Sequence, residues 1–349
     1  MHTALRVAAL AVVGLALAGC GGTVSTSPPS TSQTPSPTAT PGIGPAAVVS
    51  AGELRRWEAD ALAFAQRFND AWADADAAFA AFSEDAAVID PSNADFSIAP
   101  KSEIIASWRG FAADVPDYSA RTTGAYLSTA AGAYLTEVKG LWPADVASPS
   151  GQPLLHELRL FRFAGERSTA AATTFELWYR LDDMEALLGG CVAPDRCAPE
   201  VRAFAQRYLA AWSSDDPAQI AALYRDDATL ADSLLGISAS GADAIGGVGL
   251  GRFGSGAPAC SVQDVYIQTN DGDPKTSDNT DPDGGKIIGI AIVHRCASAA
   301  GGSQPIDGVS VLLLGTRQPN GFDLDPRGLI VSDETFHDAD GLIATGVTQ

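Results

Sequence analysis

Three histidines follow the N-terminal segment of the chain, and they are the first residues to consider for acid–base chemistry. They are His156, His294 and His337, which lie far apart in the sequence. Because no paired-histidine or HExxH spacing is present, we expect no catalytic metal and no cofactor. His156 stands beside Glu157 on an expected inner strand, where it could face a pocket as an acid or base, although a partly buried structural histidine is the alternative.

Two further motifs have ligand-like spacing without the surroundings that the chemistry needs. Gly249–Gly254 fits the GxGxxG pattern of dinucleotide sites, but it neither follows a clear strand nor opens a helix. The loop Asn279–Gly284 has the oxygen spacing of calcium loops, but its twelfth position is Ile290 rather than a bidentate acid. We therefore expect neither a nucleotide nor a calcium site.

The cysteines favour disulfides over thiols or zinc. Besides Cys20 there are four, an even number for an oxidising compartment, and no CxxC supplies zinc-ligand spacing. Cys260 begins one β-like run and Cys296 ends another, so a hairpin would place them opposite each other. Cys191 and Cys197 would then close a small loop. Two disulfides with this pairing are predicted.

The elements that must position these residues are repeated. The segment FAQRFNDAW, starting at Phe64, returns as FAQRYLAAW, starting at Phe204, at a spacing of about 140 residues. In each copy three aromatic residues follow helical spacing, then come an acidic turn, a second short helix and a β-like run. The aromatic residues are Phe64, Phe68 and Trp72 in one copy and Phe204, Tyr208 and Trp212 in the other.

Each copy is followed by a helical piece and four β-like runs. In the first copy the runs lie near 118–128, 131–140, 154–164 and 170–180, and in the second near 260–269, 286–296, 308–316 and 327–336. Helices first and antiparallel strands after them indicate an α+β fold with the helices packed on one face of a curved sheet.

Each half resembles the nuclear transport factor 2-like superfamily, close to its SnoaL-like branch. The resemblance is carried by the first helix and by four further segments, which are FSEDAAVIDP, LYRDDATLAD, PKSEIIASWRGFAADVPD and FELWYRLDDMEALLG. It implies two tandem cone-shaped domains, 51–190 and 191–349, each with a mostly apolar pocket. The superfamily includes isomerases, cyclases, dehydratases and many non-catalytic binders, so the fold implies a pocket and no particular reaction.

The resemblance also implies a candidate catalytic pair. Tyr208 and Asp232 stand where the ketosteroid isomerases of this superfamily have their oxyanion-hole tyrosine and general base. A carboxylate can remove a proton next to a carbonyl while a phenol stabilises the enolate oxygen. The first half has Phe68 for the tyrosine, keeps Asp90 near the base position and has Arg159 about where a further acid belongs.

The alternative is that these residues only pack and turn the chain. Because the stretch SVLLLGT supplies no second acid, we expect Asp232 to be largely solvated or to cap local backbone. Most of the large aromatic residues should be core, with one or two at a pocket mouth. The expected pocket residues are Phe68, Trp72, Asp90, Trp108, His156 and Trp212.

The N-terminus predicts export and a lipid anchor. A short apolar run over residues 7–17 forms a secretory signal that ends at residue 19, and Leu17–Cys20 resembles the lipobox of bacterial lipoproteins. Cys20 would then carry the lipid, and residues 20–50, rich in Ser, Thr and Pro, would form a disordered stalk. An ordinary secretory signal with a chance cysteine is the alternative.

The composition limits the classes of molecule that we expect this protein to bind. The formal net charge is −20, with four lysines and 18 arginines and no basic cluster, which argues against nucleic acid. We expect a protein anchored to the membrane through Cys20 on the outer face of the cytoplasmic membrane, which binds a small apolar ligand or an envelope protein and is not an enzyme. The alternative is an isomerase, cyclase or dehydratase acting on a hydrophobic carbonyl compound through Asp232 and Tyr208.

Overall fold

A computed structural model gives the fold of the chain. It describes residues 49–89, 97–98, 100–114, 119–128, 134–141, 154–164, 171–188, 198–214, 216–248, 259–270, 286–297, 305–318, 321–325 and 327–344. Several features predicted from the sequence lie outside these residues. They are the signal, Cys20, most of the stalk, Asp90, the Cys191–Cys197 pair and the loops 249–254 and 279–284. None of the helices that the structure describes is both long enough and apolar enough to cross a membrane.

The fold is α+β, and the first half has the expected order of elements. They are α2 (Ala51–Asp70), α3 (Ala75–Ala78), β1 (Phe82–Ile89), β2 (Ser97–Ile98), α4 (Lys101–Asp114), β3 (Ser119–Leu127), β4 (Tyr134–Leu141), β5 (Leu154–Phe163), β6 (Ala172–Arg180) and α5 (Leu181–Leu188).

The second half repeats this order, including the last helix, and adds the hairpin of β12 and β13. Its elements are α6 (Ala198–Ser214), α7 (Pro217–Ala221), β7 (Tyr224–Asp232), β8 (Ile237–Ser240), α8 (Ala242–Val248), β9 (Ala259–Asn270), β10 (Lys286–Ala297), β11 (Ile306–Leu313), β12 (Gly315–Gln318), β13 (Gly321–Leu324), β14 (Ile330–His337) and α9 (Ala339–Ala344). The eight predicted β-like runs are confirmed.

Local sequence fixes the helix starts. Ser50 and Glu53 form a capping box at the start of α2, where each side chain satisfies a backbone N–H of the other residue. The acidic turns of the repeat are N-caps: Asp74 accepts from the Ala77 N–H before α3, and Asp216 does the same for α7. Hydrogen bonds from the Gln219 side chain and the Ala218 N–H lower the pKa of Asp216 below its ordinary value.

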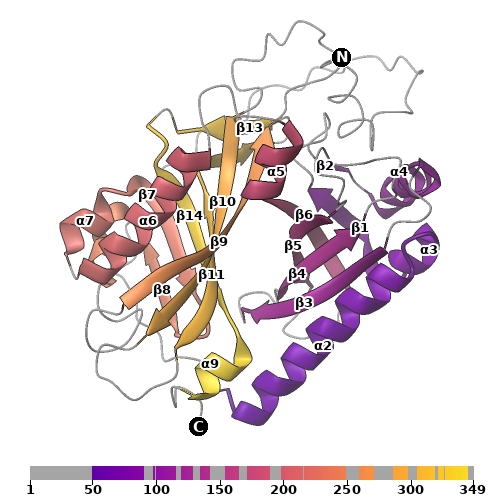
Figure 1. Ribbon diagram of the computed structural model, residues 1–349, viewed down its shortest axis with the longest axis horizontal. Helices are drawn as coiled ribbons and strands as arrows, with labels where there is room; N and C mark the ends of the chain where they lie inside the picture. Colours follow the sequence, from indigo (N-terminus) through magenta and orange to yellow (C-terminus); the bar gives the residue numbers. More distant parts are fainter. Residues whose placement is uncertain are drawn as a thin grey trace, which may run out of the picture.

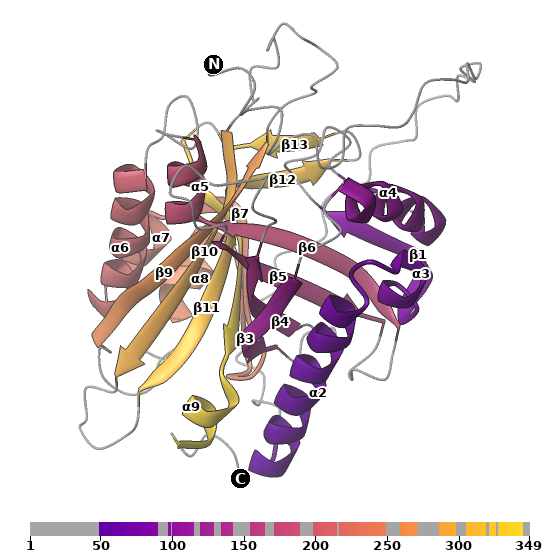
Figure 2. The ribbon, with the colours of Figure 1, turned by 45° about the vertical axis from the view of Figure 1, so that its right-hand side comes forward.

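The long strands of the two halves join into one circuit. From β14 the hydrogen-bonded order runs β11, β10, β9, β6, β5, β4, β3 and back to β14 (Figures 1 and 2). The first-half and second-half strands meet at two short joins, where Tyr179 and Arg180 pair with Ile267 and Tyr266, and His337 pairs with Leu127. β1 and β7 run parallel to β6 and β14, so the sheet is mixed.

The buried apolar side chains of the described residues form three clusters. One lies under α2 and α4 of the first half, and a second lies under α6 and α8 of the second half. The third contains strand residues of both halves, among them Leu158, Trp178, Val311 and Phe336. Because side chains alternate along a strand, β5, β6, β10, β11 and β14 each give one face to the helices of their own half and the other to this shared cluster.

Polar groups also connect the halves. Ser128 lies 2.9 Å from Ser233 between their hydroxyl oxygens, and Arg162 of β5 donates to Glu334 of β14 at 2.7 Å. Burial lowers the pKa of the Arg162 guanidinium, but the charges of Glu176 and Glu334 outweigh it and hold that pKa above its ordinary value. Arg162 is therefore charged and neutralises carboxylates from both halves.

The structure confirms the predicted Cys260–Cys296 disulfide. The two cysteines are directly paired residues on β9 and β10, with their Cα atoms 4.1 Å apart. The bond ties the ends of two strands whose connecting loop is long.

We expect replacement of Cys260 and Cys296 together by Ala to lower the free energy of unfolding by about 3–4 kcal/mol, because the crosslink restricts the unfolded chain. Urea unfolding of oxidised wild type and of the variant measures this difference. Equal midpoints would show that the bond contributes nothing to stability.

Candidate functional site

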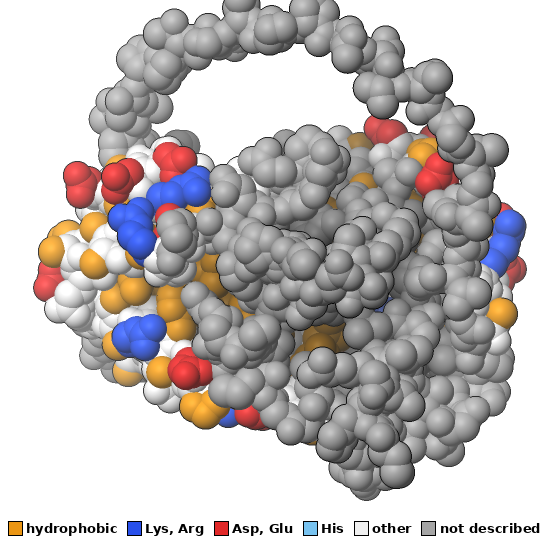
Figure 3. Space-filling model, turned by 90° about the horizontal axis from the view of Figure 1, so that it is seen from above, with side chains coloured by type: hydrophobic (Ala, Val, Ile, Leu, Met, Phe, Trp, Pro, Cys, Tyr) orange, Lys and Arg blue, Asp and Glu red, His pale blue; other side chains and the backbone are white. Residues whose placement is uncertain are grey.

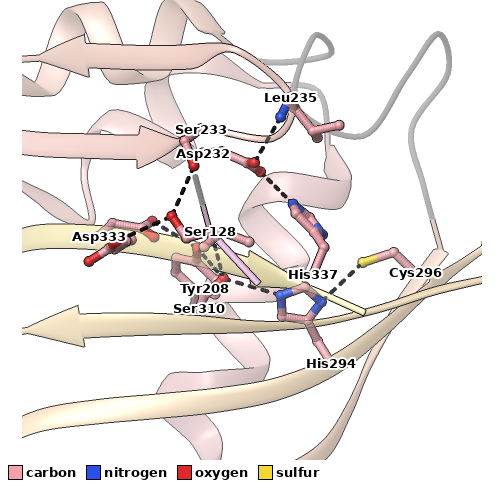
Figure 4. Close-up of polar contacts among 12 residues, drawn as sticks. Ser128, Tyr208, Asp232, Ser233, Leu235, His294, Cys296, Ser310, Asp333 and His337 are labelled. Carbon is pink, nitrogen blue, oxygen red and sulfur yellow. Dashed lines mark hydrogen bonds and ion pairs between the residues drawn. The ribbon is translucent and has the colours of Figure 1, made fainter. Parts of the chain in front are cut away.

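Polar side chains gather on the face of the second-half sheet that lies under α6. On β14 the alternate residues Asp333, Thr335 and His337 face this side, whereas Phe336 faces the shared cluster. The set, which we call the polar floor, is drawn in part in Figure 4, and all its members are buried. Its members are Tyr208, Tyr224, Asp232, His294, Ser310, Asp333, Thr335 and His337.

Asp333 is the centre of the first group of contacts. Oδ2 accepts hydrogen bonds from the hydroxyl of Tyr208 at 2.8 Å and from that of Tyr224 at 2.5 Å. Trp212 Nε1 donates to the Tyr224 oxygen at 3.3 Å. A buried carboxylate is costly unless donors satisfy it, and here two phenols on α6 and β7 do so.

A second group runs across three strands from the disulfide. Cys296 Sγ lies 3.6 Å from His294 Nδ1, and His294 Nε2 lies 3.2 Å from Ser310 Oγ. Because a disulfide sulfur carries no proton, Nδ1 is the donor in the contact with Cys296. Ser310 Oγ is also within 3.1 Å of the Tyr208 hydroxyl and of Thr335 Oγ1, so the two groups are connected.

Asp232 and His337 form a separate pair. Asp232 Oδ2 lies 2.9 Å from His337 Nε2, and Oδ1 accepts the backbone N–H of Leu235 at 3.3 Å. Both side chains are almost completely buried, with 0% and 1% of their surface exposed. His337 Nδ1 is also buried and has no hydrogen-bond partner among the residues that the structure describes.

A glycine makes room for the two imidazoles. Gly308 of β11 pairs with His294 on one side and with His337 on the other. A Cβ built on Gly308 would lie 2.8 Å from His294 Cε1, 3.0 Å from the Phe336 carbonyl oxygen and 3.3 Å from His337 Nδ1. Any larger residue would displace the histidines or the backbone.

The expected solvation of Asp232 is wrong, because this residue is buried against His337. The expectation that it caps local backbone holds for its contact with Leu235. The structure does not pair Asp232 with Tyr208, whose phenol donates to Asp333. Sequence reasoning sought a further acid on the strand SVLLLGT and missed Asp333, which lies on the neighbouring strand β14.

The first half provides an internal comparison. Phe82 and Phe175 of β1 and β6 have the strand register that Tyr224 and Asp333 have on β7 and β14. Phe68 corresponds to Tyr208 in the sequence repeat. Phe68 lies 6.1 Å from Phe82 and 5.2 Å from Phe175 between ring centroids. Three phenylalanines therefore pack where the second half has two tyrosines and an aspartate.

The other expected pocket residues of the first half are core or structural. Trp72 and Trp108 pack on each other with ring centroids 4.5 Å apart, and Phe68 packs on Trp108 at 5.4 Å. His156 accompanies Asp183 of α5, with Nδ1 2.9 Å from the carboxylate and the backbone N–H donating to the same oxygen. This placement supports the structural alternative for His156.

Arg159 does not take the place of the missing acid. Its register on β5 matches Ser310 on β11, and it is buried beside Glu157 and Asn69. Arg159 Nε donates to Glu157 at 2.9 Å, and Nη1 donates to the Asn69 side chain at 2.6 Å. The first-half position therefore holds an internal ion pair.

One cavity among the described residues includes none of the side chains of the polar floor. Its volume is about 380 Å³. It is lined by Glu200, Val201, Phe204, Arg207, Ala222, Leu223, Ile290, Arg327, Gly328 and Leu329. Ile290 is on the same face of β10 as His294, four residues away, so the cavity and the polar floor share one sheet face.

Three further observations concern the charged and metal-ligating side chains around the site and on the surface. Burial raises the pKa of Asp338, which follows His337 and caps the start of α9 through the Gly341 N–H. No cluster of three or more metal-ligating side chains occurs within the described ranges. On the face shown in Figure 3, acidic and basic side chains of described residues lie side by side on the surface.

Comparison with known proteins gives only distant structural matches. No protein-family model and no curated protein matches the chain. A SnoaL-like protein of unknown function from Burkholderia thailandensis is 18% identical, with a TM-score of 0.28 over 35% of this chain and 94% of its own. An NTF2-like protein from Burkholderia xenovorans is 15% identical, with a TM-score of 0.27 over 40% and 84%.

A third match is a protein with a ketosteroid isomerase-like fold from Catenulispora acidiphila, solved in complex with trimethylamine. It is 17% identical, with a TM-score of 0.29 over 42% of this chain and 93% of its own. The chain thus has distant structural matches of the NTF2-like and SnoaL-like type over about 35–42% of its length.

Replacement of Gly308 by Ala should lower the free energy of unfolding by about 1–3 kcal/mol, because the new methyl group overlaps both histidines and a carbonyl oxygen. The matched control is Gly110→Ala in α4, where a Cβ meets nothing within 4 Å. That change should stabilise the helix by about 0.5–1 kcal/mol. Thermal unfolding of both variants measures the contrast, and equal effects would contradict the crowding of Gly308.

Proposed function

We propose that this chain is a ligand-binding module held at the cell envelope by lipid on Cys20, and that its ligand binds at the polar floor of the second half. The proposal includes two tandem cone-shaped domains, of which the first supports the second. The ligand would be a small, mostly apolar molecule with one polar group, such as a carbonyl or hydroxyl compound.

The observation that carries this proposal is the replacement of Phe68, Phe82 and Phe175 by Tyr208, Tyr224 and Asp333. The first half shows that three apolar rings satisfy the fold at these positions. Burying a carboxylate and two phenols there costs desolvation without improving the packing. Binding of a ligand would explain why these polar groups are present, since small-molecule binding sites combine apolar walls with a few convergent polar groups.

The surroundings fit an apolar ligand with one polar end. Ile290, Ile292, Leu312 and Ile245 are buried around the polar floor on the same core cluster. His337 Nδ1 supplies a hydrogen-bonding position that no described residue occupies. A ligand hydroxyl could donate a hydrogen bond to that nitrogen, and the apolar body of the ligand would pack against the aliphatic side chains.

A second candidate function is an acid–base enzyme, an isomerase, cyclase or dehydratase acting on a hydrophobic carbonyl compound. The buried Asp232–His337 pair favours it, because a carboxylate beside an imidazole is an arrangement for moving protons. Tyr208 supports this candidate less directly, since Asp333 and Ser310 hold its hydroxyl.

An apolar triple variant tests the ligand site. We expect Tyr208→Phe, Tyr224→Phe and Asp333→Leu together to fold with a stability within about 2 kcal/mol of wild type, since donors and acceptor are removed at once. Tyr208→Phe with Tyr224→Phe alone should cost more, because Asp333 would then stay buried and lose the two phenol hydroxyls that donate to it.

The same triple variant should lose binding of a cyclic ketone. Calorimetry with β,γ-cyclohexenone, and with cyclohexene as the apolar control, measures binding to wild type and variant. The matched control is Phe68→Tyr in the first half, which should leave binding unchanged. If the triple variant binds the ketone as tightly as wild type does, the ligand site is elsewhere.

The anchor has its own test. Cys20→Ser should move the protein from the membrane fraction to the soluble fraction, because one thioether-linked lipid group holds it there. Immunoblotting of separated fractions measures the distribution. Retention of the variant in the membrane at the wild-type level would mean that something other than Cys20 anchors the chain.

A further inference from the structure

We infer that the cavity of about 380 Å³ in the second half is a binding site for a short aliphatic carboxylate, whose charged end is held by Arg207 and Arg327. The site is separate from the polar floor and does not depend on the ligand proposed there. Its occupant also differs in chemistry, since it carries a full negative charge.

The cavity lies at the opposite end of the strands from the Asp232–His337 pair. Leu223 and Leu329, which line it, stand directly before β7 and β14, and the Ile330 N–H donates to the Leu223 carbonyl oxygen at 2.9 Å. Asp232 and His337 are the last residues of the same two strands. Because a strand rises about 3.3 Å per residue, roughly 25 Å separate the cavity from that pair.

The walls of the cavity are apolar and belong to the core of the second half. Val201 and Ile290 are buried members of that cluster, and Phe204 and Leu223 pack against it. The volume of about 380 Å³ is near the lower end of the range for small-molecule sites. We therefore expect one short aliphatic chain as the apolar part of the ligand.

Two arginines give the cavity a charge that contrasts with the rest of the chain. Arg207 lies over the ring of Phe204, with 5.8 Å between its Cζ atom and the ring centroid. Among the described residues, no carboxylate pairs with Arg207. The lining contains Arg207, Arg327 and a single acid, Glu200, whereas the whole chain has a formal net charge of −20. The cavity thus favours an anion, although the chain as a whole repels anions.

A tight turn holds Arg327 at the cavity. Asp325 Oδ1 accepts the backbone N–H of Arg327 at 2.8 Å and that of Leu329 at 3.5 Å, and Gly328 between them has a φ of 67°. Burial raises the pKa of Asp325, but these N–H groups and the Arg327 guanidinium outweigh it and hold that pKa below its ordinary value. The ion pair with Asp325 uses Arg327 Nε, at 3.6 Å. The N–H groups on the two Nη atoms remain as donors for a ligand carboxylate.

Octanoate is the probe for this site. The full chain carrying Cys20→Ser has no lipid at that position, so titration calorimetry needs no detergent that would take up the probe. We expect octanoate to bind, and octan-1-ol and octylammonium to bind at least about tenfold more weakly, because neither accepts charge-assisted hydrogen bonds from the arginines. If octanoate does not bind, or if octan-1-ol binds as tightly, the inference is wrong.

Replacement of the arginines tests where the carboxylate binds. Arg207→Gln and Arg327→Gln should each weaken octanoate binding by about tenfold and leave octan-1-ol binding unchanged. The matched control is Arg295→Gln, which removes the same charge from the same half at a residue that is paired with Asp307 and does not line the cavity. An equal effect of all three changes would show that net charge alone attracts octanoate, and would overturn the inference.

A change without charge tests the cavity itself. Ala222 lines the cavity and is exposed, so a larger side chain there occupies the space without entering the core. Ala222→Trp should keep the thermal unfolding midpoint of the parent chain and lose octanoate binding. If this variant binds octanoate as tightly as its parent does, the carboxylate site lies elsewhere.

Discussion

In each half of this protein the long strands of the sheet carry helices on one face, and the other face is apolar and must also be covered. The two halves meet this need by covering each other. Leu158 and Trp178 of the first half and Val311 and Phe336 of the second contribute to one shared cluster. Burial of apolar surface is the largest favourable term in folding, so the arrangement of the strands follows from this mutual cover. Gly289 shows how close the approach is, since a Cβ there would come within 2.6 Å of the Trp178 ring.

That mutual cover leaves each half with an inner face of its own, and the two inner faces differ. In the first, Phe68, Phe82 and Phe175 form an aromatic core that needs no polar partner. In the second, Asp333 is satisfied by two phenols, and the buried histidines have defined partners at all but one nitrogen. One scaffold thus supports an inert core and a chemically equipped one, as expected when function depends on side chains that a fold can exchange.

The sequence predicted the elements well because periodicity reports local burial. Helical aromatic spacing, acidic caps and β-like runs are properties of short segments, and the strand from Ile306 to Leu313 needed no long-range information. The Cys260–Cys296 pairing was predictable because a hairpin brings the two residues opposite each other.

The candidate site was predicted only in part, because it depends on contacts between distant strands. Tyr208 and Asp232 were identified, but their partners lie more than a hundred residues further along the chain. Nothing local in the strand IVSDETFH marks Asp333 and His337 as inward-facing, since polar residues alternate there in a way that also suits a solvated face. The comparison of strand registers between the halves is what separates those alternatives.

The position of β14 has a consequence for the order in which the polar floor forms during folding. This strand completes the circuit by pairing with β3, β7 and β11, and His337 meets Leu127 across about 210 residues of chain. Contacts between residues so far apart form late, because the intervening chain must first be brought to order. A chain in which β14 has not yet paired therefore holds neither Asp333 nor His337 in place. The polar floor is complete only when this C-terminal strand has paired with its neighbours.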